Sequence, residues 1–129
     1  VQGFHMNKEM ISDHGLQKKV FEGFDMVLSG HYHTKSSQEN ITYLGTQYEI
    51  TWSDYNDPKG FHVLDLKTRE IERIVNPYKM FHKIFYNDKN KTLEQLTDHD
   101  FDSFKGTYVK VVTIHKENPY WLDVFLDKL

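Results

Sequence analysis

The sequence predicts an α/β protein that is richer in strand than in helix and is divided into two parts. Short apolar runs bounded by Gly, Pro, Asn or Asp recur along its 129 residues, and this pattern is typical of strands. Asn76-Pro77 interrupts the pattern, and a new strand pattern starts shortly after it. A chain of this length suits one domain, or one domain and part of another. We therefore expect a first domain at 1–76 and a second, small domain at 77–129.

The first part opens with a loop and one short helix. Ser12 or Asp13 is suited to cap a helix at 16–21, and Gly23 is suited to end it. A continuous apolar run at 26–28 follows, at the centre of a strand expected at 25–29. A run of this kind predicts a buried strand in a sheet that is covered on both faces.

The remainder of the first part alternates between turn-forming and strand-forming segments. In order, we expect a polar hairpin loop at 34–40, a strand at 41–44, an extended aromatic segment at 46–52, a turn at 54–60, and a hairpin of two strands at 61–66 and 69–75. These segments make the first part predominantly β.

The second part has strand patterns at 80–86 and 108–115 and ends in a helix that Pro119 opens. Proline fits the first turn of a helix because it gives up no intrahelical hydrogen bond there. Val109 and Val111 share one face of the later strand, since side chains alternate along extended backbone. We expect that face to be covered by three apolar residues of the last helix: Trp121, Leu122 and Phe125.

The composition limits the class of function. A formal charge of −3 disfavours nucleic-acid binding through bulk electrostatics, so a local basic patch or a metal would have to hold phosphates. The chain has no cysteine, which suits a reducing compartment and leaves only nitrogen and oxygen as metal ligands. Because no apolar run could span a membrane, we expect a cytoplasmic protein without a membrane partner. The chain starts with Val1, and we expect it to be a piece of a longer protein.

Gly30-His31-Tyr32-His33 directly follows the predicted strand and is the best candidate for a metal site. In extended backbone, residues i and i+2 point to the same side, so His31 and His33 would project together while Tyr32 faces away. Gly30 would allow a sharp turn out of the strand. Ligand sites in such sheets gather at the carboxyl ends of strands. The alternative is that both histidines lie on a surface loop and bind nothing.

The run at 24–33 resembles the last metal-binding motif of the calcineurin-like metallophosphoesterases, in which a strand ends at Gly-His-x-His. Residues 41–46 and 57–65 are similar to a passage of the SbcD-type DNA double-strand-break nucleases, and most of all to the small subunits of T-even bacteriophage recombination endonucleases. The resemblance implies that 1–76 is the C-terminal half of a metallophosphoesterase β-sandwich flanked by helices. By position, 77–129 would be a small α/β capping domain that recognises DNA and need not be complete.

The resemblance also implies a metal site. In the family, the two histidines of this motif each ligate one of two divalent ions, usually manganese, with magnesium or zinc as alternatives; here they are His31 and His33. The bridging aspartate and the general-acid histidine of the family have no counterpart in the chain. No catalytic residue is therefore assigned, and we expect the chain alone to be inactive. His5 is a fallback ligand candidate.

The implied function is that of a two-metal DNA exonuclease or endonuclease subunit, which hydrolyses phosphodiester bonds at DNA ends in recombination and repair. Lys35, Tyr48 and Trp52 are candidates for DNA contact, although packing in a core explains Tyr48 and Trp52 equally well. The implied partners are DNA, an SbcC-type ATPase large subunit and a second copy joined through residues upstream of Val1. For a bacteriophage protein the compartment would be the host cytoplasm. The alternatives are a phosphomonoesterase or nucleotidase of the same superfamily, and a non-catalytic β-rich binding module.

Overall fold

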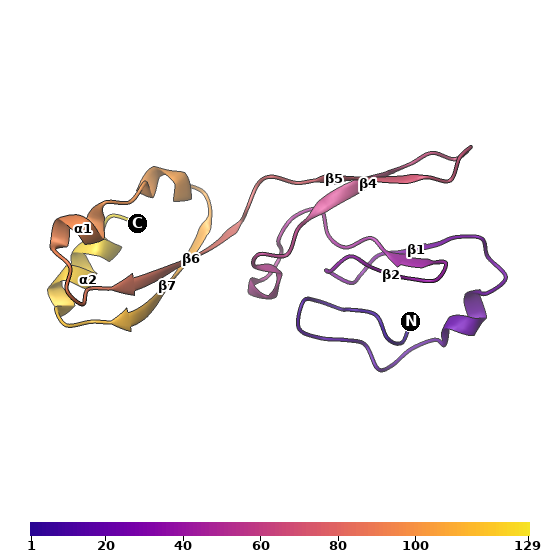
Figure 1. Cartoon of the computed structure of the whole chain (residues 1–129), viewed down its shortest axis with the longest axis horizontal. Helices are drawn as coiled ribbons and strands as arrows, with labels where there is room; N and C mark the ends of the chain where they lie inside the picture. Colours follow the sequence, from indigo (N-terminus) through magenta and orange to yellow (C-terminus); the bar gives the residue numbers. More distant parts are fainter. The chain divides into compact units, whose positions relative to one another are not determined.

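The computed structural model describes Val1–Leu129, and the chain divides into two compact units, Val1–Lys79 and Met80–Leu129. The first unit has two small sheets, the second has one, and each unit has its own core (Figure 1). The class is α/β, as expected, with few and short helices. No helix combines the length and the apolar character that crossing a lipid bilayer requires.

The first unit contains a three-stranded mixed sheet. Strand β1 (Val27–Ser29) pairs in parallel with β3 (Ile41–Tyr43), and β3 pairs antiparallel with β2 (Ser36–Gln38). A 3-10 helix, η1 (Lys18–Phe21), lies within the helix expected at 16–21. The expectation of a loop throughout 34–40 is wrong, because β2 lies inside it. Its polar side chains gave no strand signal, and β2 depends on backbone hydrogen bonds to β3 instead.

Strand β1 is less buried than its apolar sequence predicts. It lies at the edge of the sheet, with β3 as its one neighbour. Leu28 is 37% exposed and lines a surface hollow with Phe24 and Met26. The prediction of a strand covered on both faces is therefore wrong, because an edge strand with one partner leaves its apolar side chains partly open.

The core of the first unit forms around Phe4, Ile41 and Tyr43, which are at most 5% exposed. Ile41 and Tyr43 share the inner face of β3, as the alternation of side chains along a strand requires. The ring of Tyr32 stacks on that of Tyr43, with 4.2 Å between their centroids. The middle residue of the Gly-His-x-His motif thus anchors the loop after β1 to the core.

Strands β4 (Gly60–Leu64) and β5 (Ile71–Val75) form the predicted antiparallel hairpin, which confirms that expectation. Gly60 tolerates no side chain, because an added Cβ would lie 2.2 Å from the carbonyl oxygen of Ile74. The aromatic segment 46–52 forms no strand. It has strand-forming residues but no partner strand, and it leads instead into a 3-10 helix, η2 (Trp52–Asp54).

The glycine that the loop after β1 requires is Gly45 and not Gly30. A Cβ added at Gly30 would meet no atom within 4 Å, and the left-handed backbone is taken by the next residue, His31, with φ of 75°. Gly45 has φ of +78°, and its added Cβ would lie 2.9 Å from the backbone nitrogen of Lys35 and 3.1 Å from the carbonyl oxygen of His33. Our explanation of Gly30 is therefore wrong.

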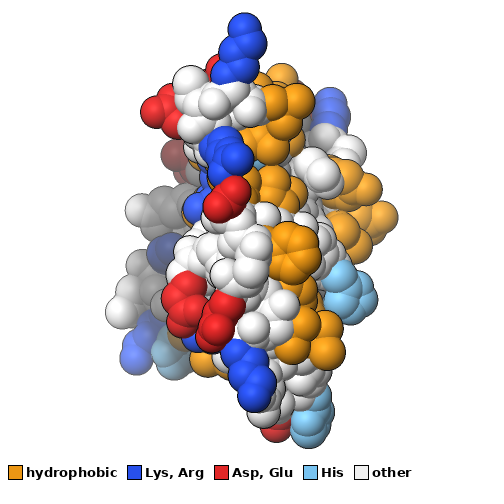
Figure 2. Space-filling view, turned by 90° about the vertical axis from the view of Figure 1, so that its right-hand side faces the viewer, with side chains coloured by type: hydrophobic (Ala, Val, Ile, Leu, Met, Phe, Trp, Pro, Cys, Tyr) orange, Lys and Arg blue, Asp and Glu red, His pale blue; other side chains and the backbone are white.

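Many large apolar side chains of the first unit remain on the surface. Phe24, Phe61 and Val63 are each more than half exposed. The face drawn in Figure 2 carries several groups of such hydrophobic side chains among the charged ones.

The second unit is built on two parallel strands, β6 (Phe81–Asn87) and β7 (Tyr108–His115). The crossover between them contains a short helix, α1 (Leu93–Thr97), and a 3-10 helix, η3 (Phe101–Phe104), neither of which was predicted. Helix α2 (Pro119–Leu126) follows β7 with proline at its start, as predicted. Thr92 caps α1, accepting a hydrogen bond from the backbone nitrogen of Gln95.

The core of the second unit confirms the predicted packing of β7 against the last helix. Its buried residues include Tyr86 from β6 and Phe125 from α2, whose rings meet edge to face with centroids 5.5 Å apart. The remaining members pack around them: Ile84, Leu96, Phe101, Phe104, Val109, Val111, Trp121 and Leu122. The opposite face of β7 is open, and Tyr108 on it is 61% exposed.

Asp88 connects the end of β6 to the start of α2. Its carboxylate, in a residue only 2% exposed, accepts hydrogen bonds from the backbone nitrogens of Glu117 and Asn118 at 2.8 and 2.9 Å. Tyr86 donates a further bond at 3.3 Å. Burial alone would raise the pKa of Asp88, but the hydrogen bonds from Asn118, Glu117 and Tyr86 outweigh it, so the pKa lies below its usual value.

We expect Asp88→Asn to weaken the second unit and to reduce its sensitivity to acid. A carboxyl whose pKa is depressed on folding stabilises the fold above its unfolded pKa of about 4, and this stabilisation is lost as the pH falls through the folded pKa. Amide hydrogen exchange of Glu117 and Asn118 between neutral pH and about pH 3 measures the effect. Asp98→Asn, which changes an exposed carboxylate of the same unit, is the control. Equal acid sensitivity in wild type and Asp88→Asn would contradict this role.

We expect Gly45→Ala to destabilise the first unit by about 2 kcal/mol or more, because alanine is strained at positive φ and its Cβ would press on backbone atoms. Gly30→Ala is the matched control and should change stability by no more than about 0.5 kcal/mol. Urea unfolding of both variants measures the difference. Equal stability of the two would show that the loop relaxes freely around Gly45.

Candidate metal centre

His31 and His33 lie in the loop that follows β1, and both line one surface hollow of about 150 Å³. Met6, Asn7, Tyr32 and Ser53 complete the lining. The simple alternation expected of extended backbone is wrong here, because His31 has a left-handed conformation. The structure nevertheless brings the two histidines to the same hollow. Their binding of metal stays a prediction.

The backbone of His33 is held on both sides. Its nitrogen donates to the carbonyl oxygen of Met6 at 2.7 Å. Its own carbonyl oxygen accepts from the backbone nitrogen of Thr46 at 3.1 Å and from the Lys59 ammonium at 2.9 Å. His33 is therefore fixed in place before its ring makes any contact.

The ring of His33 contacts Asp54, a fully buried residue of η2. Nδ1 lies 3.1 Å from Oδ1 and 3.0 Å from Oδ2 of the carboxylate. Asp54 is brought there by its own local turn, since its Oδ2 accepts from the backbone nitrogens of Ile50 and Thr51 at 3.0 and 2.9 Å. The Asp54 nitrogen donates to the Thr51 carbonyl oxygen at 2.9 Å, which closes the 3-10 turn, and the side chains of Thr51 and Asp54 form a capping box around it.

The hydrogen-bond partners of Asp54 show which ring nitrogen of His33 carries the hydrogen in this contact. Every other group at its carboxylate donates: the amides of Ile50 and Thr51, the Thr51 hydroxyl and the ammonium of Lys59. A carboxylate surrounded in this way is ionised and can only accept. Nδ1 of His33 must therefore carry the hydrogen, and in the neutral ring Nε2 keeps its lone pair.

The pKa of Asp54 agrees with this assignment. Its burial would raise the pKa, but hydrogen bonds from the Thr51 backbone, Lys59, the Ile50 backbone and His33 together lower it to about 2. The carboxylate is thus charged at any pH at which the protein is expected to work.

Lys59 supplies the matching positive charge. It is 3% exposed, and its three N–H groups find three acceptors: the His33 carbonyl at 2.9 Å, Asp54 at 3.0 Å and Asp57 at 2.7 Å. Thr34, next to His33, donates to Asp57 at 2.9 Å. Two carboxylates and one ammonium leave one negative charge in excess beside the ring of His33. That charge and the lone pair on Nε2 fit a cation.

The chain offers only part of a metal coordination sphere. No group of three or more His, Cys, Asp or Glu side chains is placed to hold one ion. His5 does not line the hollow of His31 and His33; it forms an isolated antiparallel bridge with Ile11. A di-metal centre would need ligands beyond these two histidines.

The three candidates for DNA contact lie at different depths. Lys35 and Tyr48 are exposed, Tyr48 by 54%. Trp52 is half-buried at the start of η2, next to Ser53 of the histidine hollow. Neither Lys35 nor Tyr48 lines that hollow. Their contact with DNA stays a prediction.

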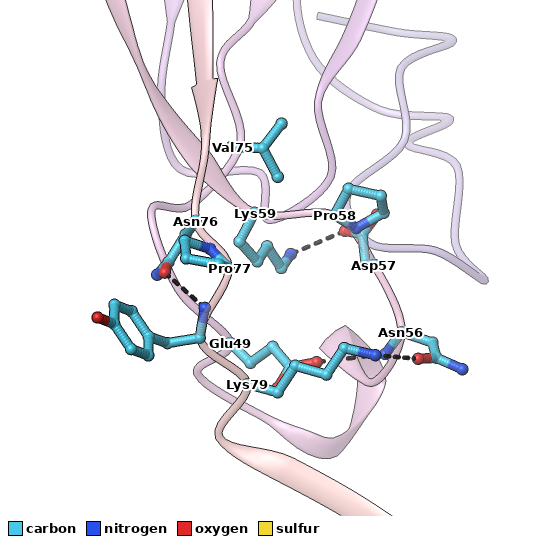
Figure 3. A pocket seen from close by; sticks show the side chains of 10 residues that line it. Glu49, Asn56, Asp57, Pro58, Lys59, Val75, Asn76, Pro77 and Lys79 are labelled. Carbon is cyan, nitrogen blue, oxygen red and sulfur yellow. Dashed lines mark hydrogen bonds and ion pairs between the residues drawn. The ribbon is translucent and has the colours of Figure 1, made fainter.

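A second hollow, of about 280 Å³, shares Asp57 and Lys59 with this cluster but contains neither histidine. Figure 3 shows Lys59 reaching toward Asp57, and Lys79 reaching toward Asn56, whose nitrogen donates to the buried Glu49. Lys59 and Asp57 pair with each other, and Lys79 and Glu49 are each hydrogen-bonded to Asn56. The imidazole nitrogens of the predicted metal site lie at the smaller hollow instead.

Asp54 and Lys59 are the residues of the site that the sequence interpretation missed. Both lie in the segment that was assigned to a turn because it contains Asp, Asn, Pro and Gly. One local signal was available, because Thr51-Trp52-Ser53-Asp54 has the spacing of a capping box. That signal predicts the helix start and gives no indication of the contact with His33.

Comparison with known proteins gives two relatives. The chain is 35% identical over 112 residues to exonuclease subunit 1 of Enterobacteria phage T4, which covers 87% of this chain and 31% of the relative. It is 30% identical over 66 residues to the D subunit of the SbcCD nuclease of Staphylococcus saprophyticus, which covers 50% of this chain and 18% of the relative. No protein-family model matches the chain, and no solved structure matches it significantly.

The chain thus spans about a third of the T4 relative and less than a fifth of the staphylococcal one. Within these limits the comparisons confirm the resemblance that the sequence motifs indicate. The chain is a homologue of SbcD-type nuclease subunits, related to the phage T4 exonuclease subunit.

Proposed function

We propose that the chain contributes to a metal-dependent DNA nuclease that hydrolyses phosphodiester bonds at DNA ends in recombination and repair. The observation that carries the proposal is the geometry of His33: its Nδ1 is committed to a buried carboxylate, and its Nε2 has no protein partner in a hollow that it shares with His31. Both relatives are named as nuclease subunits, which supports DNA as the substrate.

In this proposal, 1–76 is the C-terminal part of a calcineurin-like metallophosphoesterase sandwich, and 77–129 is the capping domain. The exposed apolar side chains of the first unit support the first assignment, since a larger domain would cover them. The second unit has a separate core, which suits a small additional domain.

His31 and His33 would each give an imidazole nitrogen to one of two divalent ions, with Mn²⁺ preferred over Mg²⁺ or Zn²⁺. Two such ions lower the pKa of a bound water and neutralise the phosphate in a phosphodiester hydrolysis. In this chain, Asp54 holds the ring of His33 and Lys59 holds the His33 carbonyl. The ligand nitrogen would therefore be in place before an ion binds. The other ligands and the general acid would come from elsewhere in the nuclease.

Partners follow from the same proposal. The name of the staphylococcal relative assigns it to a nuclease whose two parts are lettered C and D, so we propose an SbcC-type ATPase as the partner of this chain. A second copy of the nuclease subunit and the cytoplasm as the compartment, the host's in the case of a phage, belong to the proposal too. Lys35, Tyr48 and Trp52 would contact the DNA.

We expect His31→Ala and His33→Ala each to weaken Mn²⁺ binding and to abolish cutting of double-stranded DNA ends by the whole protein. Each change removes one ligand but little packing, because the loop is at the surface. Tyr32→Phe is the matched control. It keeps the ring that stacks on Tyr43, and it should keep both metal binding and activity. Calorimetric Mn²⁺ titration together with an end-labelled DNA assay measures these effects.

Full DNA cutting by both alanine variants would reject the nuclease proposal and leave a non-catalytic binding module. If the wild-type protein hydrolyses phosphomonoesters or nucleotides but not DNA, and the alanine variants lose both metal binding and that activity, the phosphatase alternative is favoured.

We also expect the chain of 129 residues alone to show no nuclease activity, because it has no group of three ligands for one ion. The same DNA assay on the purified chain with added Mn²⁺ is the measurement. Metal-dependent cutting that His31→Ala abolishes would show that the remaining ligands lie within the chain after all.

A further inference from the structure

We propose that Asp54 is the positioning residue of the metal ligand His33, and that Lys59 is the buried cation that holds the two together. This inference rests on the proposed function, because it assigns Nε2 of His33 as the nitrogen that faces the metal. It goes beyond the two histidines of the motif by naming the groups that select their tautomer and orientation.

The first step is the direction of the ring. Asp54 lies with both carboxylate oxygens within 3.1 Å of Nδ1, which gives the imidazole a two-point contact on one edge. The opposite edge carries Nε2, and the His33 side chain is 28% exposed at the hollow shared with His31. A ring held at Nδ1 can therefore offer only Nε2 to an ion in that hollow. Carboxylate–histidine pairs of this kind commonly support protein metal sites.

The second step is that other hydrogen-bond donors fix the position of the Asp54 carboxylate. Asp54 receives two backbone amides from its own turn, which fix its position independently of His33. The Thr51 hydroxyl donates a further bond at 3.3 Å, and Lys59 donates one at 3.0 Å between two almost fully buried groups. The carboxylate thus keeps a full set of donors whether or not an ion is present, so the ring is organised before any ion binds.

The third step is that Lys59 contacts the same histidine a second time. Its ammonium donates to the His33 carbonyl at 2.9 Å as well as to Asp54. Lys59 itself precedes β4, and its own carbonyl accepts from Asn76 at the end of the hairpin at 2.8 Å. The β4–β5 hairpin therefore carries one of the groups that fix the position of the metal ligand.

Nitrogen NMR of the whole protein with ¹⁵N-labelled histidine, recorded first without metal, tests the assignment in the wild type. We expect the His33 resonances, identified by their absence in His33→Gln, to show a protonated Nδ1 and an unprotonated Nε2. In the neutral ring, a proton on Nε2 with none on Nδ1 would overturn the proposal whatever the behaviour of any variant.

Asp54→Asn should release this tautomer preference and weaken Mn²⁺ binding about 10- to 100-fold, which is the usual effect of losing such a supporting group. Asp57→Asn is the matched control, because Asp57 contacts Lys59 but not the ring. In this control the His33 tautomer should stay as in wild type. Broadening of the His33 Nε2 resonance by added Mn²⁺ reports binding without any assay of activity.

The two proposals fail in different ways. If Mn²⁺ broadens no histidine resonance of the wild type, the proposed function is rejected. The metal-positioning role of Asp54, which depends on it, is then rejected as well. If Mn²⁺ broadens His33 equally in wild type and in a folded Asp54→Asn variant, the positioning role alone is overturned. If Asp54→Asn does not fold, the wild-type tautomer measurement still decides the assignment.

Discussion

The buried ion pair between Asp54 and Lys59 is the interaction on which the candidate site depends. Burying two charges has a large desolvation cost, and such a pair persists only where further hydrogen bonds satisfy both partners. Here they do: Asp54 receives two backbone amides and the His33 ring, and Lys59 reaches two further acceptors. The loop after β1, the turn at η2 and the start of β4 thus meet at one charged cluster.

The apolar core and the charged cluster have separate tasks in the same loop. Tyr32 stacks on Tyr43 and ties the loop to the sheet, while His33 on its other side is held entirely by polar contacts. Gly45 allows this arrangement, because its left-handed backbone lets the chain pass within van der Waals distance of the His33 carbonyl. Tyr32 therefore contributes packing, while the neighbouring His33 is positioned by polar contacts.

The sequence patterns predicted the helices and strands whose formation depends mainly on neighbouring residues. The β4–β5 hairpin, β7 and α2 follow from alternation, a tight turn and a proline-opened helix, and all were expected from the sequence. Strand β2 was not, because its polar residues carry no periodic signal and it exists only through pairing with β3. The exposure of Leu28 was missed for the related reason that burial depends on which elements lie beside a strand.

The candidate site shows the same division at the level of single residues. Gly-His-x-His is contiguous and was recognised, whereas Asp54 and Lys59 lie 21 and 26 residues from His33 and join it only in the fold. Their arrangement also bears on the choice between a structural and a functional histidine. In both cases Nδ1 can be held by the protein, and the difference lies in what Nε2 meets at the hollow, where the His33 side chain is 28% exposed. His33 uses Nδ1 within the protein and sits beside a carboxylate cluster with one negative charge in excess, so under the proposed function Nε2 is the nitrogen that would meet a cation.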